Sequence, residues 1–141
     1  MAAQTVHNAV IAAASELSTA GGEVSIVLTD DSAIARLNRD WRGIDKPTNV
    51  LSFPASDQKA SGGTRLLGDI IIAYQTLERE CEDENRIFLH HLAHLAIHGF
   101  LHLNGYDHQN DTQADEMETL ERKIMSRLNM PDPYLEREPG A

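Results

Sequence analysis

Three histidines in the second half of the chain have a spacing that is typical of a metal site. They are His98, His102 and His108, in the run HGFLHLNGYDH. Imidazoles four residues apart lie on one face of a helix, with Cβ atoms roughly 6 Å apart, so both rings can reach one ion. Asn104 and Gly105 predict that the helix ends before the third histidine, because glycine just past a helix end takes the left-handed conformation without steric cost. His108 can then return to the same ion from the turn.

The ligand set favours zinc. Three neutral nitrogen ligands leave a fourth position for water, as in catalytic rather than structural zinc sites. We therefore expect one Zn2+ per chain at His98, His102 and His108. His94 and His98 form another pair with the same spacing, but only the pair His98 and His102 leaves the third histidine on a short loop. For His94 we expect a supporting role beside the ligands, or packing in the core.

The same ligand spacing, H-x3-H-x2-G-x2-H, also occurs in the metzincin metalloproteases. Those enzymes carry a glutamate directly after the first histidine, where it acts as the general base, and that position here is Gly99. Asp69 and Asp107 are the remaining carboxylate candidates. Asp107 is better suited to orient His108 or to cap the turn, and Asp69 could be structural or line the cleft. A zinc peptidase is therefore a disfavoured alternative.

Length and composition favour a single cytoplasmic domain over residues 1–141. The chain has 141 residues and one cysteine, so it can bury a core without disulfide bonds. No apolar run approaches the length that crosses a bilayer. The first residues carry no Lys or Arg before their apolar patch, which argues against a signal peptide and for a cytoplasmic enzyme without membrane contact.

Charge is unevenly distributed along the chain. The net charge is −10, which argues against strong unaided binding of nucleic acid. Residues 32–66 nevertheless carry six bases and three acids, a local charge of +3. Arg42 belongs to this segment. On charge alone, an ordinary solvated surface segment is slightly favoured over a binding surface.

Apolar periodicity predicts an α+β fold with a small sheet of three or four strands covered by about five helices. The histidine helix is expected at the centre, largely buried, with its histidines opening onto a cleft. In the helix that ends at Trp41, we expect Ile34, Leu37 and Trp41 to face inwards. Asp111 or Thr112 is expected to cap the last helix. Helices are expected at about 6–17, 32–41, 73–83, 86–103 and 112–128, and strands at 23–28, 48–53 and 67–72, with a turn-rich loop at 54–66.

Five motifs are present: WRGIDKPTNVLSFP (41–54), LLGDIIIA (66–73), HGFLHLNGYDH (98–108), EME (116–118) and DPY (132–134). Together these motifs are far more specific than the histidine spacing alone. Through them, the sequence from about Val27 to Tyr134 resembles the YbeY-type metal-dependent endoribonucleases of bacterial rRNA maturation.

The resemblance implies both a site and a substrate. His98, His102 and His108 would bind zinc, and Arg42 would match an arginine regarded as necessary for activity. The substrate would be single-stranded RNA, notably the 3′ end of small-subunit rRNA, with a further role in ribosome quality control. The implied partners are the immature small ribosomal subunit and its assembly factors. A non-catalytic assembly factor with a mainly structural zinc remains a second alternative.

Overall fold

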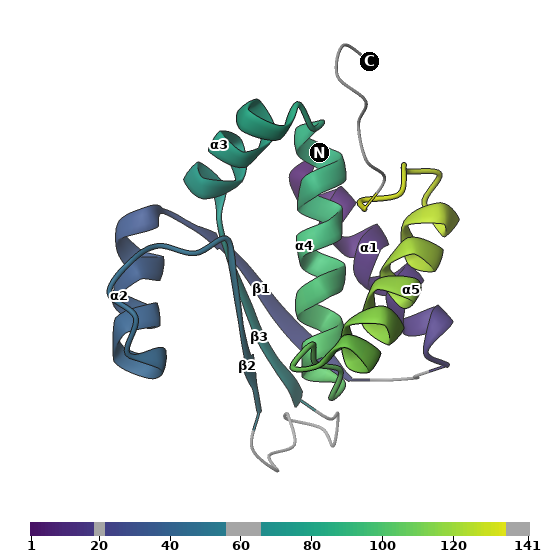
Figure 1. Ribbon diagram of the computed structural model, residues 1–141, viewed down its shortest axis with the longest axis horizontal. Helices are drawn as coiled ribbons and strands as arrows, with labels where there is room; N and C mark the ends of the chain where they lie inside the picture. The colour runs from purple at the N-terminus through teal and green to yellow at the C-terminus, as the bar shows by residue number, and fades with distance from the viewer. Residues whose placement is uncertain (19–21, 56–65, 135–141) are drawn as a thin grey trace.

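A three-stranded sheet separates one helix on its first face from a larger helical layer on its second (Figure 1). The computed structural model describes residues 1–18, 22–55 and 66–134. Within these ranges the elements are α1 (Ala2–Glu16), β1 (Glu23–Thr29), α2 (Asp31–Arg42), β2 (Val50–Pro54), β3 (Leu66–Ala73), α3 (Tyr74–Glu84), α4 (Phe88–Leu103) and α5 (Asp111–Arg127). The predicted α+β class is confirmed.

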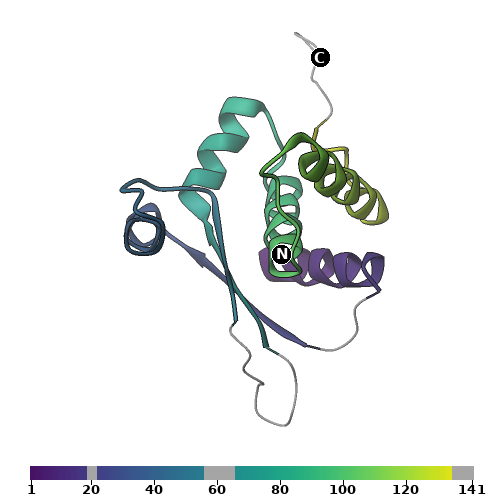
Figure 2. The same cartoon turned by 60° about the horizontal axis from the view of Figure 1, so that its bottom comes forward.

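The sheet has the order β1-β3-β2, with β1 parallel and β2 antiparallel to the central strand. β2 is therefore an edge strand. Because side chains alternate along a strand, Ile70 and Ile72 of β3 enter the core cluster that includes α4 residues. Ile71 and Ala73 enter a smaller cluster with Ile34 of α2. Figure 2 shows α2 and the larger helical layer on opposite sides of the sheet.

α4 is the central helix of the larger layer, as predicted. It packs against α1, α3, α5, β2 and β3, and its apolar residues are buried almost all the way round, which is expected of a core helix. Gly99 allows the helix to approach the sheet closely. A Cβ atom at this position would lie 2.8 Å from Ile70 Cγ2 and 3.1 Å from Ser52 Oγ.

The predicted element boundaries agree with the structure to within a few residues, and two local expectations are wrong. Asn110 caps α5, since its side chain accepts from the backbone N–H of Gln113 at 2.9 Å, so neither Asp111 nor Thr112 does. Trp41 does not face inwards and is 71% exposed.

One further expectation falls outside the described residues. Most of the predicted loop at 54–66 lies outside the described residues, which break off between 55 and 66. None of the helices in the described ranges is long and apolar enough to cross a membrane.

Candidate metal centre and its cleft

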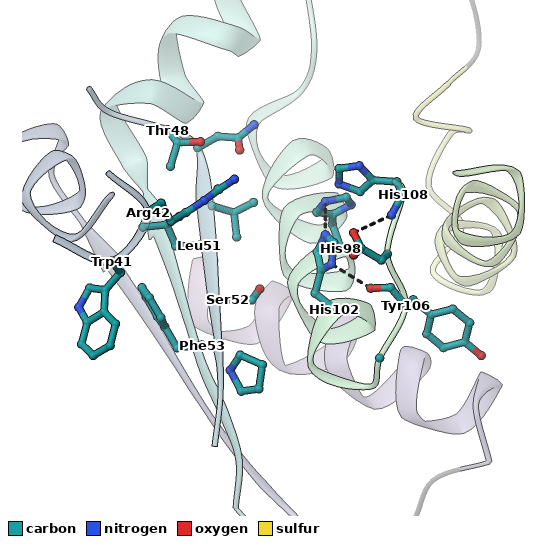
Figure 3. A pocket seen from close by; sticks show the side chains of 15 residues that line it. Trp41, Arg42, Thr48, Leu51, Ser52, Phe53, His98, His102, Tyr106 and His108 are labelled. Atoms are coloured by element: carbon teal, nitrogen blue, oxygen red, sulfur yellow. Dashed lines mark hydrogen bonds between the residues drawn. The ribbon is translucent and has the colours of Figure 1, made fainter. Parts of the chain in front are cut away.

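The structure brings His98, His102 and His108 together at the end of α4 (Figure 3). Each ring offers a nitrogen, and these nitrogens all lie within 4.8 Å of one another. α4 ends at Leu103, and Gly105 has a φ of +93°, so the chain reverses there as predicted. No fourth His, Cys, Asp or Glu joins the cluster within the described part of the chain.

Hydrogen bonds fix the orientation of the two helical rings. Nδ1 of His98 lies 3.0 Å from a carboxylate oxygen of Glu121, and Nδ1 of His102 lies 2.9 Å from the carbonyl oxygen of Tyr106. Both oxygens are acceptors, so in each ring Nδ1 carries the proton and Nε2 keeps its lone pair. Such partners are what hold metal-binding histidines in position.

The two Nε2 atoms face each other at a separation of 3.0 Å. Two unprotonated imidazole nitrogens repel at this distance unless they share a cation. Two ligands that each lie 2.0–2.1 Å from one tetrahedral ion would be about 3.3 Å apart, close to the observed separation. The donor set therefore fits a divalent ion.

Electrostatics also favour a neutral, ligand-competent ring at His102. Burial lowers the pKa of His102, and the neighbouring His98 and His108 lower it further. A neutral imidazole is the form that binds a metal.

Glu121 is a fully buried carboxylate behind the cluster, and it bonds to His94 and His98 of α4. Nε2 of His94 donates to it at 2.8 Å, Nδ1 of His98 at 3.0 Å and the hydroxyl of Tyr134 at 2.7 Å. Burial alone would raise its pKa, but these hydrogen bonds from His94, His98 and Tyr134 lower the pKa to about 2. The carboxylate thus stays ionised and holds the proton on His98 Nδ1.

His94 has the supporting role that was expected, because it bonds to Glu121 and not to the cluster. The sequence analysis missed Glu121 itself. A signal was present, since Glu121 follows Met117 by four residues and precedes Ile124 by three on the buried stripe of α5. A charged residue at such a position requires a buried partner.

The carboxylates considered as general bases lie elsewhere or are engaged. Asp107 lines the cleft, and its side chain accepts from the backbone N–H of His108 at 2.8 Å. This contact caps the turn, as expected. Asp69 is exposed and lies outside the cleft lining.

A cleft of about 720 Å³ runs from the histidines across the edge strand β2 to the end of α2. Arg42 lines it on the α2 side, with the guanidinium directed towards α4 (Figure 3). The structure gives Arg42 no ion pair with any residue of the described ranges. Its positive charge is therefore available to an anion in the cleft.

The edge of β2 contributes backbone groups to the same cleft. The carbonyl of Asn49 accepts from the N–H of Ala73 at 3.0 Å on the β3 side. By the alternation of an antiparallel ladder, Val50 and Ser52 direct their N–H and C=O groups to the open edge. Both residues line the cleft.

The comparisons with known proteins give a consistent result. The family model described as "Endoribonuclease YbeY" matches residues 1–129. A curated relative of that name from Bradyrhizobium sp. (strain BTAi1) is 52% identical, covering 97% of this chain and 85% of its own. Another relative of that name, from Nitrobacter hamburgensis, is 57% identical, and the match covers 94% of this chain and 73% of the relative's own. A Thermotoga maritima protein whose structure was determined in solution has a TM-score of 0.60 at 23% identity, covering 99% of this chain and 93% of its own, which supports the fold.

The fold and the site define a small α+β protein with a histidine cluster suited to a metal ion. The family match and the curated relatives specify it further: the chain belongs to the YbeY endoribonuclease family. The resemblance seen in the sequence motifs is confirmed.

Proposed function

We propose that this protein is a single-strand-specific, metal-dependent endoribonuclease with one Zn2+ per chain. The observation that carries the proposal is the convergence of three imidazoles on a cleft that Arg42 also lines, with no ion pair to any described residue. The curated relatives are named as endoribonucleases, which supports RNA as the substrate.

His98, His102 and His108 are the proposed ligands. A divalent ion bound there supplies Lewis acidity to a phosphoryl oxygen and lowers the pKa of a water molecule. The chain's own contribution is positioning. Glu121 and the Tyr106 carbonyl keep the protons of His98 and His102 on Nδ1, so each Nε2 is directed into the cluster.

Arg42 is the proposed stabiliser of charge during cleavage. A guanidinium matches two phosphate oxygens at once and is permanently charged. Cleavage of a phosphodiester increases the negative charge on those oxygens, so a fixed cation in the cleft stabilises the transition state more than the bound substrate. This role follows from the side chain's direction and from its lack of an ion pair among the described residues.

The dimensions of the cleft suit a single strand. Its volume of about 720 Å³ is in the range of pockets that hold small ligands, so a single nucleotide fits in it. Splayed, unpaired bases expose polar edges, and the free backbone groups of Val50 and Ser52 can bond to these edges or to ribose.

We further propose that the substrate in the cell is the 3′ end of small-subunit rRNA, with a role in ribosome quality control. The partners are the small ribosomal subunit and its assembly factors, in the cytoplasm. A net charge of −10 favours this arrangement, because an acidic protein gains from a partner that presents the RNA.

The close packing of Gly99 disfavours the peptidase alternative. A side chain at residue 99 would project into Ile70 and Ser52 of the sheet, where even a Cβ atom lies 2.8 Å from its nearest neighbour. A glutamate base has no room there.

The test is cleavage of a single-stranded RNA, the matching duplex and casein, each with and without chelator. We expect only the single strand to be cut, and only without chelator. Metal content is measured in parallel for the double variant His98→Ala/His102→Ala and for His90→Ala, a control on the same helix. Metal loss in the double variant alone is expected. Equal metal in both variants, or cleavage that survives chelation, would contradict the proposal.

A further inference from the structure

Trp41 is the only tryptophan in the chain, and it is left in solvent. Its exposed fraction is 71%. Burying an aromatic side chain of this size contributes several kcal/mol to folding, and the helical spacing from Ile34 would have allowed an inward position. The structure instead places the indole on the last turn of α2, where that turn reaches the cleft.

The indole has a defined position there. Its ring lies with its centroid 5.8 Å from that of Phe53, at an interplanar angle of 62°. Phe53 lies on β2, which belongs to the body of the sheet, so the contact steadies the indole without covering it. Both rings line the same cleft as the three histidines. In Figure 3 they lie side by side, on the side of Arg42 away from the histidines.

The local charge suits an anionic chain. Residues 32–55 hold four bases (Arg36, Arg39, Arg42 and Lys46) and two acids, in a protein that is otherwise strongly acidic. Of these bases, Arg42 lines the cleft, so a phosphate is attracted to its α2 end. An aromatic ring beside a cation that contacts the backbone is how proteins bind single-stranded nucleic acid without sequence preference.

We propose that Trp41 is a stacking platform for an unpaired RNA base next to the phosphate that Arg42 contacts. This inference rests on the proposed function and names a further binding residue for the same site. It also gives a physical reason for single-strand specificity, because a base inside a duplex cannot leave its neighbours to stack on the indole.

Stacking of this kind acts on binding more than on chemistry. The base is held equally before and during cleavage, so its loss raises KM and leaves kcat nearly unchanged. Replacing a stacking aromatic by alanine weakens binding by roughly 5- to 150-fold. We expect this range for Trp41→Ala with single-stranded RNA, and a smaller loss for Trp41→Phe.

The test uses the emission of Trp41, which reports from one position. Zinc-loaded protein is mixed in a stopped-flow instrument with single-stranded oligoadenylate, or with an abasic strand of the same length that keeps the phosphates. We expect the oligoadenylate to quench the emission and the abasic strand to leave it nearly unchanged. Equal quenching by the two strands would mean that Trp41 responds to the phosphates and not to a base, and would overturn the proposal.

Affinity and cleavage are then measured for Trp41→Ala, Trp41→Phe and Tyr74→Ala. Tyr74 is a matched control, since it is an exposed aromatic outside the cleft lining. We expect Trp41→Ala alone to raise KM strongly, with its affinity for the abasic strand unchanged. Wild-type affinity and KM in Trp41→Ala would overturn the proposal. If that variant nevertheless bound small ribosomal subunits more weakly, Trp41 would be a contact for protein rather than for a base.

The outcomes separate this proposal from the function on which it rests. Cleavage of RNA without base-dependent quenching would support the nuclease and exclude the stacking role. Base-dependent quenching without cleavage would support the stacking role and exclude the nuclease. If neither cleavage nor quenching is observed, both proposals are excluded.

Discussion

Glu121 is the residue on which the orientation of His98 depends. It is buried, ionised and bonded to two imidazoles and a phenol. In Glu121→Gln the neutral amide accepts more weakly and places an NH2 donor where the carboxylate only accepted. We expect zinc affinity to fall by about 10- to 100-fold, as measured by competition with a chromophoric chelator.

The matched control for Glu121→Gln is Glu118→Gln on the same helix. Glu118 has only a 3.9 Å contact with Arg122, and we expect its replacement to leave zinc affinity unchanged. Equal affinity in the two variants would mean that His98 is held by the fold alone.

Arg42 is expected to contribute to turnover and not to metal binding. Arg42→Ala should reduce kcat by about 100-fold, the usual cost of removing a fixed group that stabilises developing charge, while zinc content stays at the wild-type level. Arg42→Lys should restore part of the activity, because a lysine keeps the charge but loses the bidentate geometry. Assays on single-stranded RNA, with zinc measured in the same preparations, test this; unchanged turnover in Arg42→Ala would exclude the role.

Sequence reasoning identified the three histidines because their local spacing determines their geometry. Arg42 came only from the family resemblance, since nothing in its neighbourhood distinguishes it from a surface arginine. Glu121 was missed because its partners are 23 and 27 residues away in the chain, a distance over which helical periodicity says nothing. Its position on a buried stripe was the one local hint.

At the scale of elements, α4 and the strands were predictable because their apolar patterns are long and regular. α2 was harder. The 3.6-residue period from Ile34 reaches Trp41, but the period does not reveal where the sheet below the helix ends. Whether the last turn still has a strand to pack on is a tertiary property, and here it overhangs the cleft.

The close approach of α4 to the sheet can be tested at Gly99. Gly99→Ala gains about 1 kcal/mol in helix propensity, but the new methyl group must displace Ile70 or Ser52, which costs about 1–3 kcal/mol. We expect a net loss of about 1 kcal/mol in the free energy of unfolding, measured by urea denaturation. Ser126→Ala, on the exposed side of α5, is the control and should change stability by only a few tenths of a kcal/mol. A higher free energy of unfolding for Gly99→Ala would show that Ile70 and Ser52 move to accommodate the methyl group.

At the scale of the whole molecule, we expect the core to form without the metal. The buried cluster of α1, α4, α5 and the sheet consists of apolar residues and includes none of the three ligands. Removal of zinc should therefore leave the far-UV circular dichroism unchanged and lower Tm by about 5–10 °C, the shift expected for an ion at about 100 times its Kd.

The double variant His98→Ala/His102→Ala is the control for zinc removal, and its Tm should not respond to zinc or chelator. Complete unfolding of the wild-type protein by chelator, with no cleavage of RNA, would instead identify the ion as structural and the protein as a non-catalytic assembly factor.

The helix that carries His98 and His102 is also the helix around which the interior is built. Local fluctuations that would loosen those two ligands must therefore break the most extensive packing in the molecule, so their amide protons should exchange only through global unfolding. His108, on the turn beyond, is exposed and free of that constraint. Release and recapture of the ion should accordingly begin at this third imidazole, with the other two staying fixed as a rigid half-site.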